Sequence, residues 1–246
     1  MSNLFSGAKR AVERLSGSRI YRNSLPHGAD CFFDIERKLG RDGIKVIFDV
    51  GANIGQSALT YVNELPRAEV FSFEPVAATY RQLVAATSQY PKVHAFQVGM
   101  GREAGSAVIH VSPHSHTSSI LMNRAAEDHP ETITLETVAG FAETHGVQTI
   151  DFLKIDTEGF DLEVLAGAAP LLREQRVHFI LSECEPFVRE KEYVSFQALG
   201  EFLADYGYSL FGVYDQHLEW EGRNILWYWN ALFICEKLVA PGARWP

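Results

Sequence analysis

Cysteine is scarce in this sequence, and no apolar run approaches the length of a membrane span. The three cysteines, Cys31, Cys184 and Cys235, lie far apart and form no Cys-x-x-Cys pair, so their spacing indicates neither a zinc site nor a redox centre. Their odd number, in a sequence without a recognisable secretory signal, predicts reduced thiols and a cytoplasmic protein. A transmembrane segment is not expected, because a spanning helix needs about 20 consecutive apolar residues.

Positive charge is also in short supply. The chain carries 22 Lys and Arg against 31 Asp and Glu, a formal net charge of −9. Because nucleic-acid binding requires a basic surface, this balance argues against a nucleic-acid substrate. The exception is segment 1–22, which has five basic residues and one acidic residue, +4 in total. We interpret it as a solvated helix that packs on the domain or on a second subunit of a homo-oligomer, with contact to an anionic membrane or to a polymer-synthesis partner as the alternative.

The sequence does have enough apolar content for one sizeable core. At 246 residues, with 46% hydrophobic and 22% charged residues, it has the composition of a globular α/β domain. It shows no internal repeat and no low-complexity tract. We therefore predict a domain over 41–246, preceded by an N-terminal helical extension over 1–40.

The most informative segment is 46–55, which reads Val-Ile-Phe-Asp-Val-Gly-Ala-Asn-Ile-Gly. A buried strand that ends in a glycine-rich turn, with a helix directly after it, is how α/β folds bind nucleotide-like ligands. The candidate cofactor-binding residues here are Asp49, Gly51, Asn53 and Gly55. A dinucleotide fingerprint would place glycine at 51, 53 and 56, and Asn53 and Gln56 do not fit, so an NAD-dependent dehydrogenase is disfavoured.

A carboxylate follows at the position that this fold predicts. Glu74 ends the next apolar segment, 19 residues past Gly55 (74 − 55). An acid at the end of the second strand accepts hydrogen bonds from ribose hydroxyls. Asp49 and Gly51 followed by Glu74 is the arrangement of Rossmann-like S-adenosylmethionine (SAM) enzymes, in which the glycine turn faces the methionine part. Gln97, after the third strand, is the candidate for the adenine. The alternative is an ordinary glycine turn with an exposed glutamate.

Segment 150–168 points to a family. It reads Ile-Asp-Phe-Leu-Lys-Ile-Asp-Thr-Glu-Gly and, after one Phe, Asp-Leu-Glu-Val-Leu-Ala-Gly-Ala. This resembles the FkbM family of SAM-dependent methyltransferases, whose hallmark is D-x-x-K-I-D-x-E-G-x-E-x-x-x-L-x-G. Asp161 stands where a small residue is usual, and Glu163 is close to the usual acid. Segment 228–234 is similar to the family's closing strand, so the resemblance covers about 44–234. It implies SAM as methyl donor and a small-molecule or saccharide acceptor.

The pattern of apolar segments predicts a Rossmann-like class I methyltransferase fold: a mostly parallel seven-stranded sheet with an antiparallel edge strand and helices on both faces. Helices are expected at 31–39, 56–64, 77–87, 160–173 and 195–206. Strands are expected at 46–50, 69–73, 93–98, 151–155, 177–183, 208–214 and 229–235, and a further pair of partner strands at 106–111 and 132–135.

Two acids are the leading catalytic candidates. SAM carries an activated methyl group, so the protein must align an acceptor and exclude water. In this fold the acceptor lies over the ends of the fourth and fifth strands, where Asp156 and Glu183 stand. They could orient or deprotonate a hydroxyl, or hold a Mg²⁺ or Mn²⁺ ion that acidifies it. The alternative for Asp156 is a capping role at the next helix.

Histidines are the other candidate bases. His116 lies in a long polar loop over 112–131, and such loops often cover a site. His217 lies ahead of the last strand, near several aromatic residues that would suit a sugar ring but are more often core or dimer contacts. We therefore predict a SAM-dependent methyltransferase that modifies a hydroxyl of a saccharide or natural product. The alternatives are a small-molecule N-methyltransferase and a non-catalytic SAM- or nucleotide-binding module.

Overall fold

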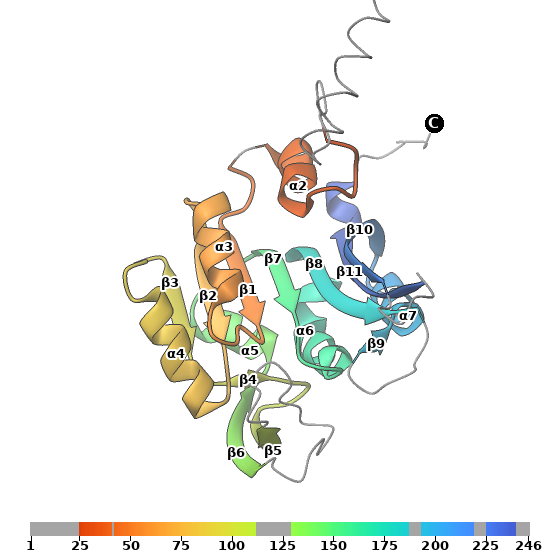
Figure 1. Ribbon diagram of the computed structural model, residues 1–246. Helices are drawn as coiled ribbons and strands as arrows, with labels where there is room; N and C mark the ends of the chain where they lie inside the picture. Colours follow the sequence, from red (N-terminus) through yellow and green to blue (C-terminus); the bar gives the residue numbers. More distant parts are fainter. Residues whose placement is uncertain (1–24, 41, 112–128, 187–192, 219–224, 240–246) are drawn as a thin grey trace, which may run out of the picture.

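The apolar segments of the sequence form the strands of one large twisted sheet (Figure 1). The computed structural model describes residues 25–40, 42–111, 129–186, 193–218 and 225–239. Along the sheet the strands run in the order β10 (Tyr208–Leu218), β11 (Leu226–Cys235), β8 (Val177–Glu185), β7 (Ile150–Ile155), β1 (Val46–Val50), β2 (Glu69–Phe73) and β3 (Val93–Phe96). A two-residue strand, β9 (Val194–Ser195), pairs with the end of β8.

The strand directions confirm the predicted fold class. β1 pairs in parallel with β2 and with β7, and β7 pairs in parallel with β8. β11 is antiparallel to both of its neighbours, β8 and β10. The antiparallel strand expected at this edge is thus β11, one position in from the end because β10 covers its outer side. The carboxyl ends of β1, β2, β7 and β8 all meet at one edge of the sheet.

Helices cover both faces of the sheet, and each face has its own apolar core. Those of the described chain are α2 (Cys31–Leu39), α3 (Gln56–Glu64), α4 (Ala77–Thr87), α5 (Val138–Thr144), α6 (Asp161–Arg173), α7 (Phe196–Ala204) and the 3-10 turn η2 (Glu236–Leu238). α5, α6 and α7 contribute to one core, and α2 and α3 to the other. The five predicted helices are present. α5 was not predicted: it is short, and Thr137 caps it by accepting from Gly140 N at 2.9 Å.

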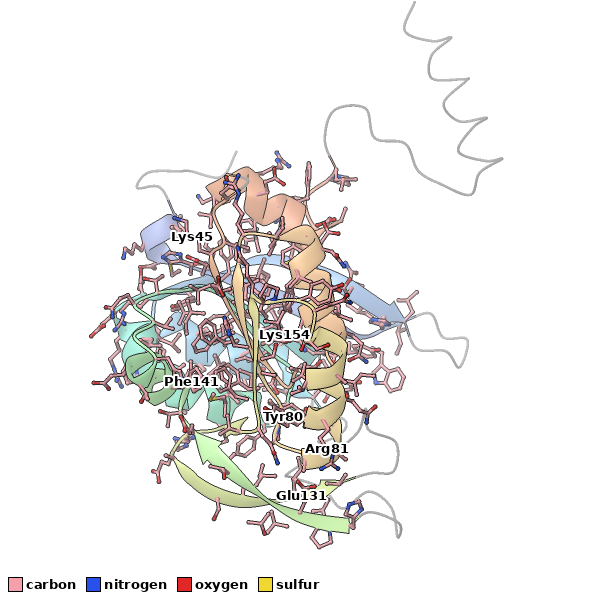
Figure 2. The ribbon with its side chains drawn as sticks, turned by 90° about the vertical axis from the view of Figure 1, so that its left-hand side faces the viewer. Lys45, Tyr80, Arg81, Glu131, Phe141 and Lys154 are labelled. Carbon is pink, nitrogen blue, oxygen red and sulfur yellow. The ribbon has the colours of Figure 1, made fainter. Side chains whose placement is uncertain are left out.

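A smaller sheet lies beside the first. It consists of β4 (Gly99–Met100), β6 (His129–Glu136) and β5 (Gly105–Val111), in that order. β5 and β6 pair with each other, as predicted, and the structure shows that they run antiparallel with Ala107 opposite Ile133. The strand expected at 93–98 is split, because the chain leaves the large sheet after Phe96 and joins the small one at Gly99. Glu131, on β6 at the bottom of Figure 2, ties this sheet to α4 by accepting from Ala77 N at 2.9 Å.

The predicted N-terminal extension is described only from residue 25 onward, so the basic segment 1–22 lies outside the described residues. Its helix α2 packs on the domain through Ile35, which is buried. The neighbouring carboxylate of Asp34 accepts hydrogen bonds from Gly28 N at 2.7 Å and from the Tyr214 hydroxyl at 3.0 Å. No helix in the described part of the chain is both long and apolar enough to cross a membrane.

Candidate active site

One cavity of about 470 Å³ opens at the carboxyl ends of the central strands. This is within the usual size range for a small-molecule site. Its lining residues come from the turns after β1, β2 and β7, from the end of β8 and from β4, β5 and β11. Predicted site residues that line it are Gly51, Asn53, Glu74, Asp156 and Glu183. The sheet therefore brings the expected cofactor and catalytic residues into one space.

The glycine turn is shaped by backbone contacts. Gly51 N and Ala52 N both donate to the carbonyl of Phe73, at 3.1 and 3.0 Å, which ties the turn to β2. Gly51 has φ +78, and a Cβ at this position would overlap the carbonyl oxygen of Asp156. Glycine is thus needed at 51 because the end of β7 comes so close. Gly55, with φ +98, starts α3 but does not line the cavity.

Asp49 lies beneath the cavity rather than in its wall. Its side chain is fully buried, and both of its oxygens accept from the Ser57 hydroxyl, at 3.1 and 2.9 Å. The ammonium of Lys154 lies 3.6 Å away. Burial raises the pKa of Asp49, against the effects of Lys154 and Ser57. Because Ser57 and Lys154 line the cavity, Asp49 supports two residues that can reach a ligand.

Glu74 presents a buried carboxylate to the cavity. Oε2 accepts from Asn53 N at 3.1 Å, and Oε1 accepts from Val76 N at 2.9 Å. These bonds fix the carboxylate at the end of β2, where each oxygen can still accept a second hydrogen bond. Burial raises the pKa of Glu74 to about 7. Two further hydrogen-bond donors, such as a pair of hydroxyls, can therefore pair with this carboxylate. Asn53 itself has φ +50, an uncommon conformation for a residue other than glycine.

Lys154 is the one basic side chain among the described residues that line the cavity, and Figure 2 shows it in the interior of the domain among the central strands. Its ammonium lies 3.0 Å from a carboxylate oxygen of Asp156 and 3.6 Å from Asp49. Burial acts to lower the pKa of Lys154, but the carboxylates of Asp156 and Asp49 raise it above its usual value. Lys154 therefore carries a full positive charge. It lies between two halves of the cavity, the first lined by the Gly51 turn and Glu74 and the second by Asp156 and Glu183. A lysine inside the apolar run of β7 is the sequence signal that could have identified it.

Glu183 contributes a titratable carboxyl group to the second half of the cavity. Burial, followed by repulsion from Asp156 and Glu158, raises the pKa of Glu183 to about 8, although Lys154 opposes the rise. A carboxyl group poised near neutral pH is suited to accept a proton. Glu158 also lines the cavity and has φ +53. Such strained backbone at a residue other than glycine is often found at functional sites, and no local sequence pattern around Glu158 predicts it.

The alternative role for Asp156, as a cap of helix α6, does not match the contact that its side chain makes with Lys154. α6 begins at Asp161, and its N-cap, Phe160, makes no side-chain capping bond. Asp156 pairs with Lys154, while the nearby Asp161 accepts from Ser182 Oγ at 2.7 Å and from Thr157 Oγ1 at 2.8 Å. Within the described ranges, no group of three or more His, Cys, Asp or Glu side chains is arranged to hold a metal ion. A metal held by Asp156 and Glu183 stays a prediction.

The remaining candidates are dispersed. Gln97 is exposed and does not line the cavity. His116 lies outside the described residues. His217 is exposed and does not line the cavity, but its ring stacks on Tyr228, which does. Tyr193 and Tyr228 are lining residues that were not among the predicted site residues.

Comparison with known proteins gives the family context. A family profile described as "Methyltransferase FkbM domain" matches residues 49–210. The chain is 27% identical to the AMB antimetabolite synthetase AmbE of Pseudomonas aeruginosa, over 63% of this chain and 9% of AmbE. It is 29% identical to the hexuronic acid methyltransferase AglP of Haloferax volcanii, over 60% of this chain and 59% of AglP. It is 24% identical to the 2-O-methyltransferase NoeI of Sinorhizobium fredii, over 56% of this chain and 62% of NoeI. The chain thus spans less than two thirds of each of these relatives.

Proposed function

This chain belongs to the FkbM methyltransferase family, and we propose that it transfers a methyl group from SAM to a hydroxyl oxygen of a saccharide or natural-product small molecule. One observation carries the proposal: a single cavity joins the Gly51 turn and the buried Glu74 to the Asp156 and Glu183 carboxyl groups. Two relatives support the proposal: AglP is a hexuronic acid methyltransferase, which supports a saccharide acceptor, and NoeI is a 2-O-methyltransferase, which supports transfer to oxygen. The net charge of −9 supports an acceptor other than a nucleic acid.

The first half of the cavity fits a nucleoside with a vicinal ribose diol. Glu74 offers the carboxylate that would accept from both ribose hydroxyls, and the Gly51 turn would lie against the methionine part. Pro75, Val76 and Met100 would enclose the adenine by apolar contact, since Gln97 lies elsewhere. When bound, SAM supplies a methyl group that is already activated for transfer.

In the second half, the protein's own groups would prepare the acceptor. We assign Glu183 as the base that takes the proton of the reacting hydroxyl, because its pKa of about 8 suits it to this role better than an ordinary carboxylate. Asp156 would orient the same hydroxyl, and Lys154 would hold the Asp156 carboxylate in place at 3.0 Å.

The alternative chemistry places Mg²⁺ or Mn²⁺ on Asp156 and Glu183, with the metal acidifying the hydroxyl. Both side chains line the cavity and offer the oxygen ligands that these ions prefer. The existing contact between Asp156 and Lys154 favours the metal-free assignment, because the ammonium already neutralises that carboxylate.

Calorimetric titration of the full chain with SAM, S-adenosylhomocysteine (SAH) and NAD tests the cofactor assignment. We expect SAM and SAH to bind and NAD to bind far more weakly or not at all. NAD binding tighter than SAH would overturn the proposal. Methyl transfer to an amine but not to its hydroxyl analogue would replace the O-methyltransferase with an N-methyltransferase. SAH binding without transfer to any acceptor would point to a non-catalytic binding module.

A further inference from the structure

Three aromatic side chains from separate segments of the chain stack beside the half of the cavity that Asp156 and Glu183 line. The Tyr228 ring on β11 lies 4.3 Å from the His217 ring on β10, with an angle of 15° between the ring planes. The Tyr193 ring, just ahead of β9, lies 5.0 Å from Tyr228 at 12°. Two near-parallel neighbours restrict the tilt of the Tyr228 ring, so its hydroxyl is held in one direction.

The position of Tyr228 relates it to the candidate base. On β11, Asn230 lies directly opposite Glu183 of β8, and Tyr228 is two residues away on the same face of the sheet. Tyr228 and Glu183 both line the cavity. Burial raises the pKa of Tyr228, with further contributions from the charges of Glu183 and Asp156, so the phenol keeps its proton. The phenol is thus a neutral hydrogen-bonding group close to both carboxyl groups.

The Tyr228 hydroxyl is available to a ligand. In the described part of the chain, no other residue forms a hydrogen bond with it, unlike the hydroxyls of Tyr208 and Tyr214, which donate to Val177 O and Asp34. A rigid phenol without a protein partner, in the wall of a cavity, leaves an unsatisfied polar group unless water or a ligand pairs with it. A polar group of the acceptor would satisfy it.

We propose that Tyr228 is a specificity-determining residue that hydrogen-bonds the acceptor hydroxyl adjacent to the one that is methylated. The site then selects a vicinal diol, as found in sugars and cyclitols, over an isolated hydroxyl. Glu183 faces the reacting hydroxyl, and its neighbour on the acceptor meets the phenol. His217 is a positioning residue that keeps the Tyr228 ring in place. This inference rests on the proposed function, because it assumes that the second half of the cavity receives the methyl acceptor.

The test compares acceptors that differ by one hydroxyl. The full chain is incubated with SAM and with the methyl glycosides of glucose, mannose and galactose, each beside its 2-, 3- and 4-deoxy analogues, and SAH formation is measured. For a glycoside that is methylated, we expect loss of the hydroxyl adjacent to the methylated position to lower kcat/KM about tenfold, the scale of one lost hydrogen bond. Equal kcat/KM for that deoxy analogue and its parent would overturn the inference.

Variants assign the effect to the phenol. Tyr228→Phe keeps the stacked ring, so we expect it to lower kcat/KM for the parent glycoside about tenfold and to abolish the further loss on the deoxy analogue. His217→Ala should weaken the discrimination, and His217→Phe, which preserves a stacking ring, should restore it. Tyr90→Phe is the matched control, since Tyr90 does not line the cavity, and it should behave as the parent chain. Discrimination that persists in Tyr228→Phe would refute the role of the hydroxyl.

A separate titration distinguishes the two levels of failure. If SAH binds but none of these glycosides is methylated, the cofactor assignment stands and the vicinal-diol inference is refuted. If methyl transfer occurs without dependence on the adjacent hydroxyl, the proposed O-methyltransferase stands and only the role of Tyr228 is lost. If neither SAH nor SAM binds, the proposed function itself fails, and the inference fails with it.

Discussion

The ammonium of Lys154 lies 3.0 Å from the carboxylate of Asp156, and this ion pair joins the two halves of the cavity. Lys154 stands directly opposite Asp49 in the β1–β7 register, and Asp49 in turn accepts from Ser57. The Lys154 ammonium thus stabilises the buried carboxylate of Asp49, below the half of the cavity that Glu74 lines. It also stabilises the half-exposed carboxylate of Asp156, in the half that Glu183 lines. Loss of the cation should affect both folding and transfer.

Lys154→Met should destabilise the protein by about 3 kcal/mol, because it leaves the buried carboxylate of Asp49 without its counter-charge. Urea unfolding measures the change. Arg67→Met is the control, since the Arg67–Asp42 ion pair is exposed and its loss should cost less than about 1 kcal/mol. Equal effects of the two substitutions would mean that Lys154 does not stabilise a buried charge.

Gly51→Ala should lower stability and remove SAH binding together. The added Cβ would overlap the carbonyl oxygen of Asp156, and φ +78 is unfavourable for alanine. Gly105→Ala on β5 is the matched control, because a Cβ there meets nothing within 4 Å, and its effect should stay within about 0.5 kcal/mol. Thermal unfolding and SAH titration give the two readouts. A Gly51→Ala protein that binds SAH normally would contradict this account of the turn.

The fold could be predicted because its strongest elements carry local signals. The apolar run 46–50 before a glycine turn, and the helical spacing in 77–87, match β1 and α4. α5 escaped prediction because a seven-residue helix offers too few turns for a clear pattern. The strands at 208–218 and 226–235 are longer than expected, because their pairing is set by contacts across a hairpin with irregular register.

Residues of the site could be predicted only where the order of strands along the chain determines where a side chain lies. Parallel strands bring Glu74, Asp156 and Glu183 to one edge of the sheet, so residues at strand ends meet there. The stack of Tyr193, Tyr228 and His217 could not be predicted, because it depends on the β8–β11 and β10–β11 registers and on which face each ring occupies. Such registers are long-range properties that no single segment encodes.

SAH affinity should rise with pH through the titration of Glu74. Its pKa of about 7 lies above the usual value for a glutamate, so the carboxyl is mostly protonated at pH 6 and mostly ionised at pH 8. Only the ionised form can accept from both ribose hydroxyls. We expect SAH to bind up to about tenfold more tightly at pH 8 than at pH 6, in proportion to the ionised fraction of Glu74. Calorimetry on Glu74→Gln, which cannot titrate, should show weaker binding with no such change, and the same pH dependence in that variant would remove Glu74 from the ribose site.

Turnover should rise as pH increases through about 8. The protonated Glu183 carboxyl cannot accept a proton, and burial together with Asp156 holds its pKa near that value, so the active ionised form gains as pH rises. Glu183→Gln should reduce kcat about a hundredfold while SAH binding stays near normal. A kcat profile measured from pH 6 to 9.5 checks the assignment. A flat profile in the parent chain would mean that another group, or none, takes the proton.

Asp156→Asn should separate the metal-free mechanism from the metal-assisted one. The amide loses the charge that pairs with Lys154, so kcat should fall about a hundredfold while the chain stays folded and binds SAH. Asp205→Asn, an exposed position at the end of α7, controls for the substitution itself. EDTA should leave the turnover of the parent chain unchanged, because Lys154 already supplies the positive charge beside Asp156. Turnover that stops with EDTA and returns with Mg²⁺ or Mn²⁺ would instead assign Asp156 and Glu183 as metal ligands. Full activity of Asp156→Asn would exclude both roles and leave Glu183 as the principal acid of the acceptor half.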